Sequence, residues 1–401
     1  MAVDAKRDVV DRALADGDGI LRMEPAWVAR DWLPAGRRLG LPEDAYDVGE
    51  RGTISERWLA STTKADNRIG PPDEGMSYIA IDGSEHVLLK DAVAADPAAI
   101  MGKEYATTHG GLGRLAKIYD FAARIPYHVH QRQQHAQLVG RHSKDEAYYF
   151  PPGVEMGPHP ETFLGVHPWI TQERAYDTLL PYLKDWNSDL ILQHAPGFVQ
   201  VYEEGFEVPS GVLHAPGTAL TIELQEDSDV LAMLQALNAG LIIDKELMWK
   251  DVRPVDRKEK GEEFILELVD WAENGDPYFY ENHRLVPQPI ETTRTPGHEE
   301  SWIFHNNSGK KFSGKRALVD PGCSYTSVER GVYNILVWRG SGRYGGLDVK
   351  AGDPDMDELL ITHERAVRGV EVANTGRDQM LIIKFFGPDI NPDVPMIARR
   401  H

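Results

Sequence analysis

The chain has 401 residues, which is more than one compact core usually holds, so we expect two or three domains. Its 63 acidic and 43 basic residues give a formal net charge of −20, and such a surface repels nucleic acid phosphates. There is no apolar run of about 18 residues, and the N-terminus lacks the apolar core of a signal peptide. Cys323 is the single cysteine, which excludes an internal disulfide. We therefore expect a cytoplasmic protein with no nucleic acid or membrane partner.

Helical patterns begin the chain. The segment Asp8–Ala15 has the apolar spacing of a helix, and Pro25 suits the first turn of a second helix that runs to Trp32. We therefore expect residues 1–48 to form a helical N-terminal arm.

From residue 49 the pattern changes to short apolar runs separated by Gly, Pro, Asn and Asp. The runs Leu115–Asp120, Glu146–Phe150 and Leu220–Leu224 are rich in β-branched or aromatic residues, which is typical of strands. One insertion is different, because Thr171 can cap a helix whose apolar residues continue to Leu183. Residues 49–245 are thus predicted to form a β domain, of the barrel or sandwich kind, with a helical insertion.

A charged connector follows, and then the strand pattern returns. Glu262–Trp271 has helical spacing inside the connector of residues 246–290. Strand patterns resume in residues 291–401, for example at Tyr333–Trp338 and Met380–Phe386. The two β halves look like distant copies of each other. We therefore predict a mainly β protein with two similar β domains, a helical arm and a helical connector.

Three histidines and one glutamate form the most informative set of residues, and only the first β half carries them. His128 and His130 are two residues apart, so on a strand they share one face. Glu146 begins the next strand pattern, and His214 follows the turn Pro-Ser-Gly. Three imidazoles and a carboxylate can hold one divalent transition metal and leave positions open for a substrate. Each residue taken alone also fits a structural role in a strand or turn.

The order and context of these residues resemble a cupin, the double-stranded β-helix or jelly-roll barrel, and more closely the type I mannose-6-phosphate isomerase family. The resemblance is carried by Glu56-Arg-Trp58, by Leu115-Ala-Lys117-Ile-Tyr-Asp and by Ser143-Lys144-Asp-Glu146. The most specific segment runs from Val208-Pro-Ser-Gly-Val-Leu-His214 to Glu223-Leu-Gln225 and Ser228-Asp229. The resemblance to the family is collinear over about residues 50–235 and is weaker from there to about residue 390. The resemblance implies two cupin-type barrels, a metal-binding one in residues 49–245 and a degenerate one in residues 291–401.

The resemblance also implies an activity and roles for individual residues. It implies an aldose–ketose isomerase that acts on a mannose/fructose-type sugar or its 6-phosphate through an enediol. His128, His130, Glu146 and His214 would bind one divalent metal, with zinc expected first and iron, manganese, cobalt or nickel as alternatives. Glu223 and Lys144 would be the catalytic acid/base groups, and Gln225 would bind substrate hydroxyls.

The sequence departs from the family pattern at two positions. His128 stands where the family usually has Gln, and no Arg follows Ser228-Asp229. Two other functions therefore stay open: a metal cupin oxygenase or lyase, and a sugar-binding cupin without catalysis.

Overall fold

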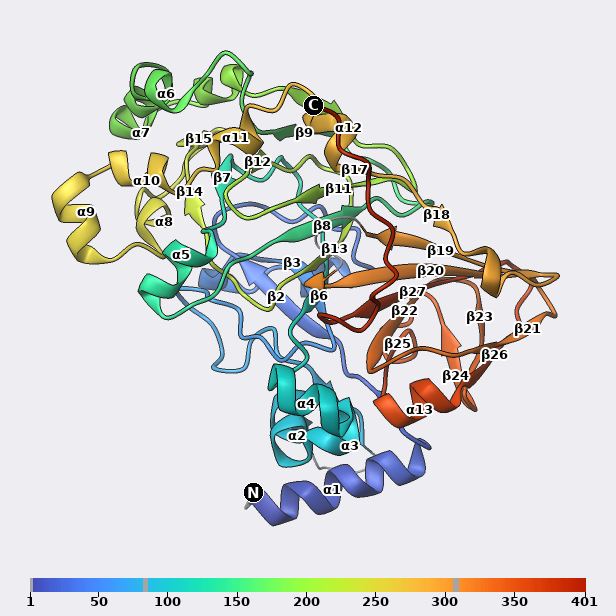
Figure 1. The fold of residues 1–401 in the computed structure, drawn as a ribbon. Helices are drawn as coiled ribbons and strands as arrows, with labels where there is room; N and C mark the ends of the chain where they lie inside the picture. The colour runs from blue at the N-terminus through green and yellow to red at the C-terminus, as the bar shows by residue number, and fades with distance from the viewer. Residues whose placement is uncertain (1–2, 82–85, 306–309) are drawn as a thin grey trace.

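Two pairs of antiparallel sheets, one in each half of the chain, form the framework of the protein, here in a computed structural model that describes residues 3–81, 86–305 and 310–401. Figure 1 shows the first pair at the upper left of the molecule and the second pair, in orange and red, at the right. Every strand pairing among the described residues is antiparallel, and many partners lie far apart in the chain, as β13 and β6 do.

The first pair combines a seven-stranded and a five-stranded sheet. The seven-stranded sheet has the order β17 (Arg284–Leu285), β11 (Gly205–Val208), β8 (Glu146–Tyr149), β13 (Thr221–Gln225), β6 (Leu115–Tyr119), β3 (Thr53–Leu59) and β2 (Ala26–Arg30). The five-stranded sheet has the order β10 (Gly197–Val199), β9 (Glu161–Leu164), β12 (Leu213–Ala215), β7 (His128–Val129) and β14 (Ala232–Met233). Polar side chains of the two sheets meet between them.

The second pair repeats this plan, and in neither pair do the described strands close into a barrel by backbone pairing. Its seven-stranded sheet has the order β1 (Ile20–Arg22), β25 (Glu358–Ile361), β22 (Tyr333–Arg339), β27 (Met380–Phe386), β20 (Ser313–Val319), β19 (His298–Phe304) and β18 (Gln288–Pro289). Its four-stranded sheet has the order β21 (Ser324–Ser327), β26 (Val370–Asn374), β23 (Ser341–Tyr344) and β24 (Leu347–Lys350). Two short hairpins complete the strands: β4 (Tyr78–Ile79) with β5 (Val87–Leu88), and β15 (Leu237–Asn238) with β16 (Leu241–Ile242).

The two seven-stranded sheets pack against each other through their outer faces. Ile222 and Leu224 of β13 lie in one buried apolar cluster with Ile383 and Phe385 of β27. The intervening residue Glu223 points to the opposite face, because successive side chains of a strand alternate. The central strands of the first sheet are therefore buried on both faces, one apolar and the other polar.

Helices cover the outer face of the first five-stranded sheet, whereas the outer face of the second half's four-stranded sheet is exposed. The outer face of the five-stranded sheet packs against an apolar cluster supplied largely by helices on that side of the molecule (Figure 1). Helix α5 (Gln133–Ala136) follows β7, and the helices of the insertion and the connector are α6 (Gln172–Thr178), α7 (Leu180–Asp185), α8 (Glu246–Trp249), α9 (Pro254–Lys260), α10 (Glu263–Glu267), α11 (Trp271–Asn274) and α12 (Phe279–His283). The others are α1 (Val3–Asp16), α2 (Leu89–Ala95), α3 (Pro97–Met101), α4 (Lys103–His109) and α13 (His363–Arg368). Within the described residues, no helix is both long and apolar enough to cross a membrane.

The predicted mainly β fold is confirmed, and so are the helix capped by Thr171 and a helix within Glu262–Trp271. The second helix of the N-terminal arm is wrong, because Ala26–Arg30 forms strand β2 at the edge of the first seven-stranded sheet. Pairing with β3 and burial of Val28 outweigh the helix-start preference of Pro25. Helices α2 to α4, which the strand-like reading of that region missed, lie between β5 and β6. The division into four segments, residues 1–48, 49–245, 246–290 and 291–401, stays a proposal.

Candidate metal centre and active site

Neighbouring strands of the five-stranded sheet position the three histidines. His128 in β7 lies directly opposite His214 in β12, and His130 follows two residues after His128. The intervening Val129 points outward into the apolar cluster that faces the helices. Strand alternation therefore directs all three imidazoles into the space between the two sheets.

The hydrogen bonds of the three rings orient them in the same way. Nδ1 of His128 donates to the carbonyl of Pro126 at 2.7 Å, Nδ1 of His130 to Val230 at 2.7 Å, and Nδ1 of His214 to Val212 at 2.9 Å. A carbonyl only accepts, so each Nδ1 carries the proton and each Nε2 presents a lone pair. Metal-binding histidines commonly have this arrangement, with the second ring nitrogen held by a carbonyl or carboxylate.

The free ring nitrogens of His130 and His214 converge on the carboxylate of Glu146. One ligand atom from each of the three histidines lies within 4.8 Å of the others. The two carboxylate oxygens of Glu146 lie 3.0 Å from Nε2 of His130 and 3.0 Å from Nε2 of His214, and the buried Nε2 of His214 has no hydrogen-bond partner among the described residues. Lone pairs so close to a carboxylate repel one another unless a cation lies between them. The donor set therefore fits a divalent metal ion.

The electrostatics of the site keep these groups in their metal-binding protonation states. Burial lowers the pKa of His128 well below its usual range, and burial together with Lys144 lowers the pKa of His130 to about 3, so both rings are neutral. Burial alone would raise the pKa of Glu146, but Lys144 and the nearest imidazoles hold it well below its usual range. The Nζ atom of Lys144 lies 3.1 Å from Nε2 of His130 and 3.1 Å from Glu146.

Glu223 faces the same space from β13. It lies opposite Lys117 in β6 and Tyr148 in β8, and its Oε1 atom is 3.3 Å from Nζ of Lys117 and 3.8 Å from Nζ of Lys144. This oxygen is buried and has no hydrogen-bond partner among the described residues. Burial, reinforced by the charge of Glu146, raises the pKa of Glu223 to about 8. A carboxyl group in that range can both accept and donate a proton near neutral pH.

These residues line one cavity between the sheets. Its polar wall contains five of the predicted site residues: His128, His130, Lys144, Glu146 and Glu223. The polar wall also contains six residues to which the sequence analysis assigned no chemical role: Arg30, Glu56, Lys117, Tyr119, Tyr148 and Asp229. The rest of the lining, called the apolar wall below, consists of Trp32, Phe121, Ile125, Pro216, Leu231 and Met233. Arg30 was not identified as a cavity residue from the sequence, because a helix was predicted for this segment. In the strand that forms instead, alternation places Arg30 on the same buried face as Val28.

Gln225 lies apart from the cavity lining, although it shares the strand face of Glu223. It is the last residue of β13, and its Nε2 donates to the carbonyls of Glu226 at 2.9 Å and Ser228 at 2.6 Å. These bonds hold the loop after the strand. The predicted role of Gln225 in binding hydroxyl groups therefore has no support from its position.

The space between the second pair of sheets contains a different polar cluster. Lys384 is completely buried there and donates to Glu300 at 2.5 Å, to Glu329 at 2.8 Å and to Ser327 at 2.8 Å. Within the described residues the three-histidine group is the single cluster of three or more metal-binding side chains. The two halves thus share a plan but not a site.

No protein-family model matches the chain, and no curated protein matches its sequence. Solved structures do match. Mannose 6-phosphate isomerase from Bacillus subtilis has a TM-score of 0.59 and 15% identity, over 91% of this chain and 99% of that chain. A variant of phosphomannose isomerase from Salmonella typhimurium has a TM-score of 0.60 and 12% identity, over 92% of this chain and 100% of that chain. A zinc-bound mannose 6-phosphate isomerase has a TM-score of 0.60 and 13% identity, over the same shares of the two chains. The chain therefore has the fold of the mannose-6-phosphate isomerases, as the sequence resemblance implies.

Proposed function

We propose that the protein is a divergent member of the mannose-6-phosphate isomerase family and a metal-dependent aldose–ketose isomerase. Its substrate would be a mannose/fructose-type sugar or the 6-phosphate of such a sugar. The observation that carries the proposal is the three-histidine cluster, with the Glu146 carboxylate beside His130 and His214, next to the cavity that Glu223 and Lys144 line. The solved structures with the same fold are described as mannose 6-phosphate isomerases, one of them with zinc bound.

His128, His130, His214 and Glu146 would hold the metal ion. When bound, such an ion polarises a carbonyl oxygen and orients the neighbouring hydroxyl group. Zinc is the first candidate because of the three imidazoles and the zinc-bound relative in fold.

Glu223 would move the proton between the two carbon atoms of the substrate. Its carboxylate takes the proton from C2 of the aldose, the electrons of the C2–H bond form the C1=C2 double bond, and the carbonyl electrons move to O1. The same carboxyl group then returns the proton to C1 while the hydroxyl group at C2 becomes the carbonyl. Lys144 donates to the oxygen that carries negative charge in the enediolate and moves protons between O1 and O2. The isomerisation is an internal redox exchange between C1 and C2, so it needs no oxidant, reductant or co-reactant.

The proposal is tested by NMR in D2O with the protein supplied with Zn2+. The substrates are D-mannose, D-fructose and the two 6-phosphates. We expect interconversion of one pair, together with deuterium uptake from solvent at C2 of the aldose or C1 of the ketose, because the proton on Glu223 exchanges. Glu223→Gln should abolish both signals while the bound metal and the circular dichroism spectrum are unchanged. The exposed Glu364 in α13 provides the matched control, Glu364→Gln, which should keep full activity.

Full activity of Glu223→Gln would remove the proposed role of this residue. Failure of the wild-type protein to interconvert either pair, with oxygen consumption on another substrate, would replace the isomerase by the oxygenase alternative.

A further inference from the structure

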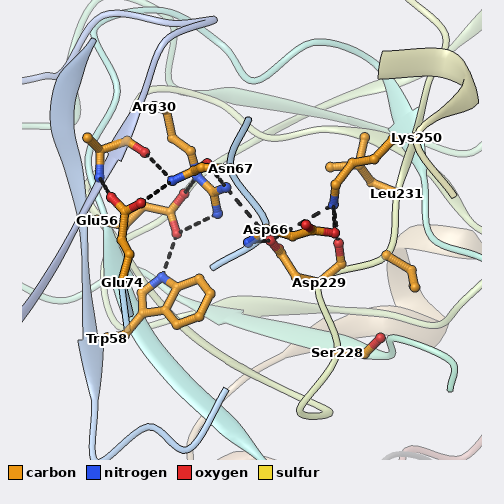
Figure 2. Close-up of polar contacts among 12 residues, drawn as sticks. Arg30, Glu56, Trp58, Asp66, Asn67, Glu74, Ser228, Asp229, Leu231 and Lys250 are labelled. Atoms are coloured by element: carbon orange, nitrogen blue, oxygen red, sulfur yellow. Dashed lines mark hydrogen bonds and ion pairs between the residues drawn. The ribbon is translucent and has the colours of Figure 1, made fainter. Parts of the chain in front are cut away.

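Every cation that lines the site cavity is paired with a carboxylate. Arg30 donates through Nε to Glu56 at 2.6 Å and lies 3.7 Å from Asp229, and a third contact joins it to Asn67 at 2.8 Å. Figure 2 shows Arg30 beside Glu56 and Asn67, and Lys250 against Asp229. Because Arg30 is 7% exposed and its carboxylate partners lie on two sides, its guanidinium is already neutralised.

The two lysines of the cavity are held in the same manner. Lys117 lies 3.3 Å from Glu223 and 3.8 Å from Glu56, and Lys144 lies 3.1 Å from Glu146 and 3.8 Å from Glu223. The lining therefore has three cationic side chains and four carboxyl side chains, so the protein brings no excess positive charge to the cavity.

The neighbouring basic residue Lys250 is also occupied. Its Nζ donates to the carbonyl of Asp229 at 2.6 Å and lies 3.4 Å from Asp66 and 3.5 Å from Asp251. It would have to abandon these partners to reach a new anion.

The apolar wall forms the rest of the cavity lining. Trp32, Phe121, Ile125, Pro216, Leu231 and Met233 offer no side-chain cation and, apart from the indole N–H, no side-chain donor. A phosphate dianion buried against such a wall loses its hydration without gaining charged hydrogen bonds, which is strongly unfavourable. The carbon–hydrogen faces of a neutral sugar, by contrast, pack well against aromatic and aliphatic side chains.

We infer that the substrate of this site is an unphosphorylated sugar, a neutral polyhydroxy aldehyde and its ketose. The inference rests on the proposed function, because it places C1 and C2 at the three histidines. A 6-phosphate is at the opposite end of a hexose from C1 and C2, so the positive charge of a metal at the histidines does not compensate it. Met233 of the apolar wall pairs with His128, so this wall begins beside the histidines, and no part of the described lining offers the far end of the sugar an unpaired cation.

The test compares free and phosphorylated sugars on the zinc-loaded protein in both activity and binding. We expect kcat/KM for the free mannose–fructose pair to exceed that for the 6-phosphates by about tenfold or more, which corresponds to ~1.4 kcal/mol. Millimolar inorganic phosphate should not inhibit. Leu231→Arg, which adds an unpaired guanidinium to the apolar wall, should shift the ratio of the two kcat/KM values toward the 6-phosphates. Leu231→Gln, of similar length and without charge, should leave the ratio unchanged.

Equal or higher kcat/KM for the 6-phosphates, or competitive inhibition of the wild-type protein by inorganic phosphate, would overturn the inference and leave the isomerase proposal intact. Calorimetric titration with the sugars separates the two claims when no turnover occurs. Binding of a free sugar but not of its 6-phosphate would uphold the inference while the isomerase proposal fails. Binding of neither would overturn the inference as well.

Discussion

Glu358 provides a quantitative test of how the two β halves are joined. Its carboxylate, in β25 of the second half, accepts from the backbone N–H of Ala60 at 2.6 Å and from Arg57 of β3 at 3.0 Å. The same Arg57 donates to Asp357 at 2.6 Å and 2.9 Å. Burial, which outweighs the attraction of Arg57, raises the pKa of Glu358 from its ordinary value of 4.5 to about 7.

This pKa sets the sign and size of a pH effect on the free energy of unfolding. Between pH 4.5 and 7 the folded protein keeps a proton on Glu358 that the unfolded chain has lost, so stability falls as the pH rises through this window. One pKa unit is worth 1.36 kcal/mol, so the rise from about pH 5.5 to about pH 8 should cost about 2 kcal/mol. Above about pH 8 the carboxyl group is ionised in both states and the contribution becomes constant.

Urea unfolding of the wild-type protein and of Glu358→Gln at about pH 5.5, 6.5, 7.0 and 8.0 would measure this effect as the difference in free energy of unfolding between the two proteins. Groups other than Glu358 cancel in that difference. We expect the wild-type protein to lose about 2 kcal/mol relative to the variant as the pH rises from about 5.5 to about 8. The exposed Glu364→Gln serves as the control for the substitution itself and should track the wild-type protein at every pH. A difference that is independent of pH, or one that grows in favour of the wild-type protein, would refute the reasoning.

Three further substitutions probe the metal centre and the two cores. Glu146→Gln removes the proposed anionic ligand, and metal affinity would be measured by competition with a chelator. Loss of a residue that only hydrogen-bonds to a ligand lowers metal affinity by about 10–100-fold, so we expect a larger decrease here. Lys384→Met leaves Glu300 buried without its cation and should lower the free energy of unfolding by about 3–5 kcal/mol in chemical denaturation. Leu224→Ala opens a cavity between the two seven-stranded sheets and should lower the melting temperature through a loss of about 2–5 kcal/mol, with the metal content unchanged.

The sequence was a good guide wherever alternation along a strand decides the outcome. Strand alternation predicted that His128 and His130 share a face, and the structure places both imidazoles between the sheets. On β13 the same alternation separates Glu223 from Ile222 and Leu224, which lie in the interface between the halves. In these strands the local pattern and the burial agree, so the pattern is informative.

Local patterns failed where distant partners determine the structure. The run from Ala26 to Arg30 becomes a strand only because β3 pairs with it, and no local signal identifies that partner. The pairing of Arg30 with Glu56 and Asp229 joins three separate parts of the chain, so spacing could not predict it. Helix α3 could have been predicted from the sequence, because Asp96 is its N-cap and Pro97 occupies its first turn. Because the helix is short, its apolar residues resemble those of the neighbouring strand-like runs.

The pairing of β1 with β25 has a consequence for how the protein is made. Ile20 lies opposite Ile361, so a strand that leaves the ribosome early must wait for a partner that is synthesised much later. Until then β1 lacks its strand partner, although α1 can already pack against α2, and this long-range closure is entropically slow. A nascent chain that stops before β25 would therefore present Ile20 and Leu21 to chaperones or to other chains.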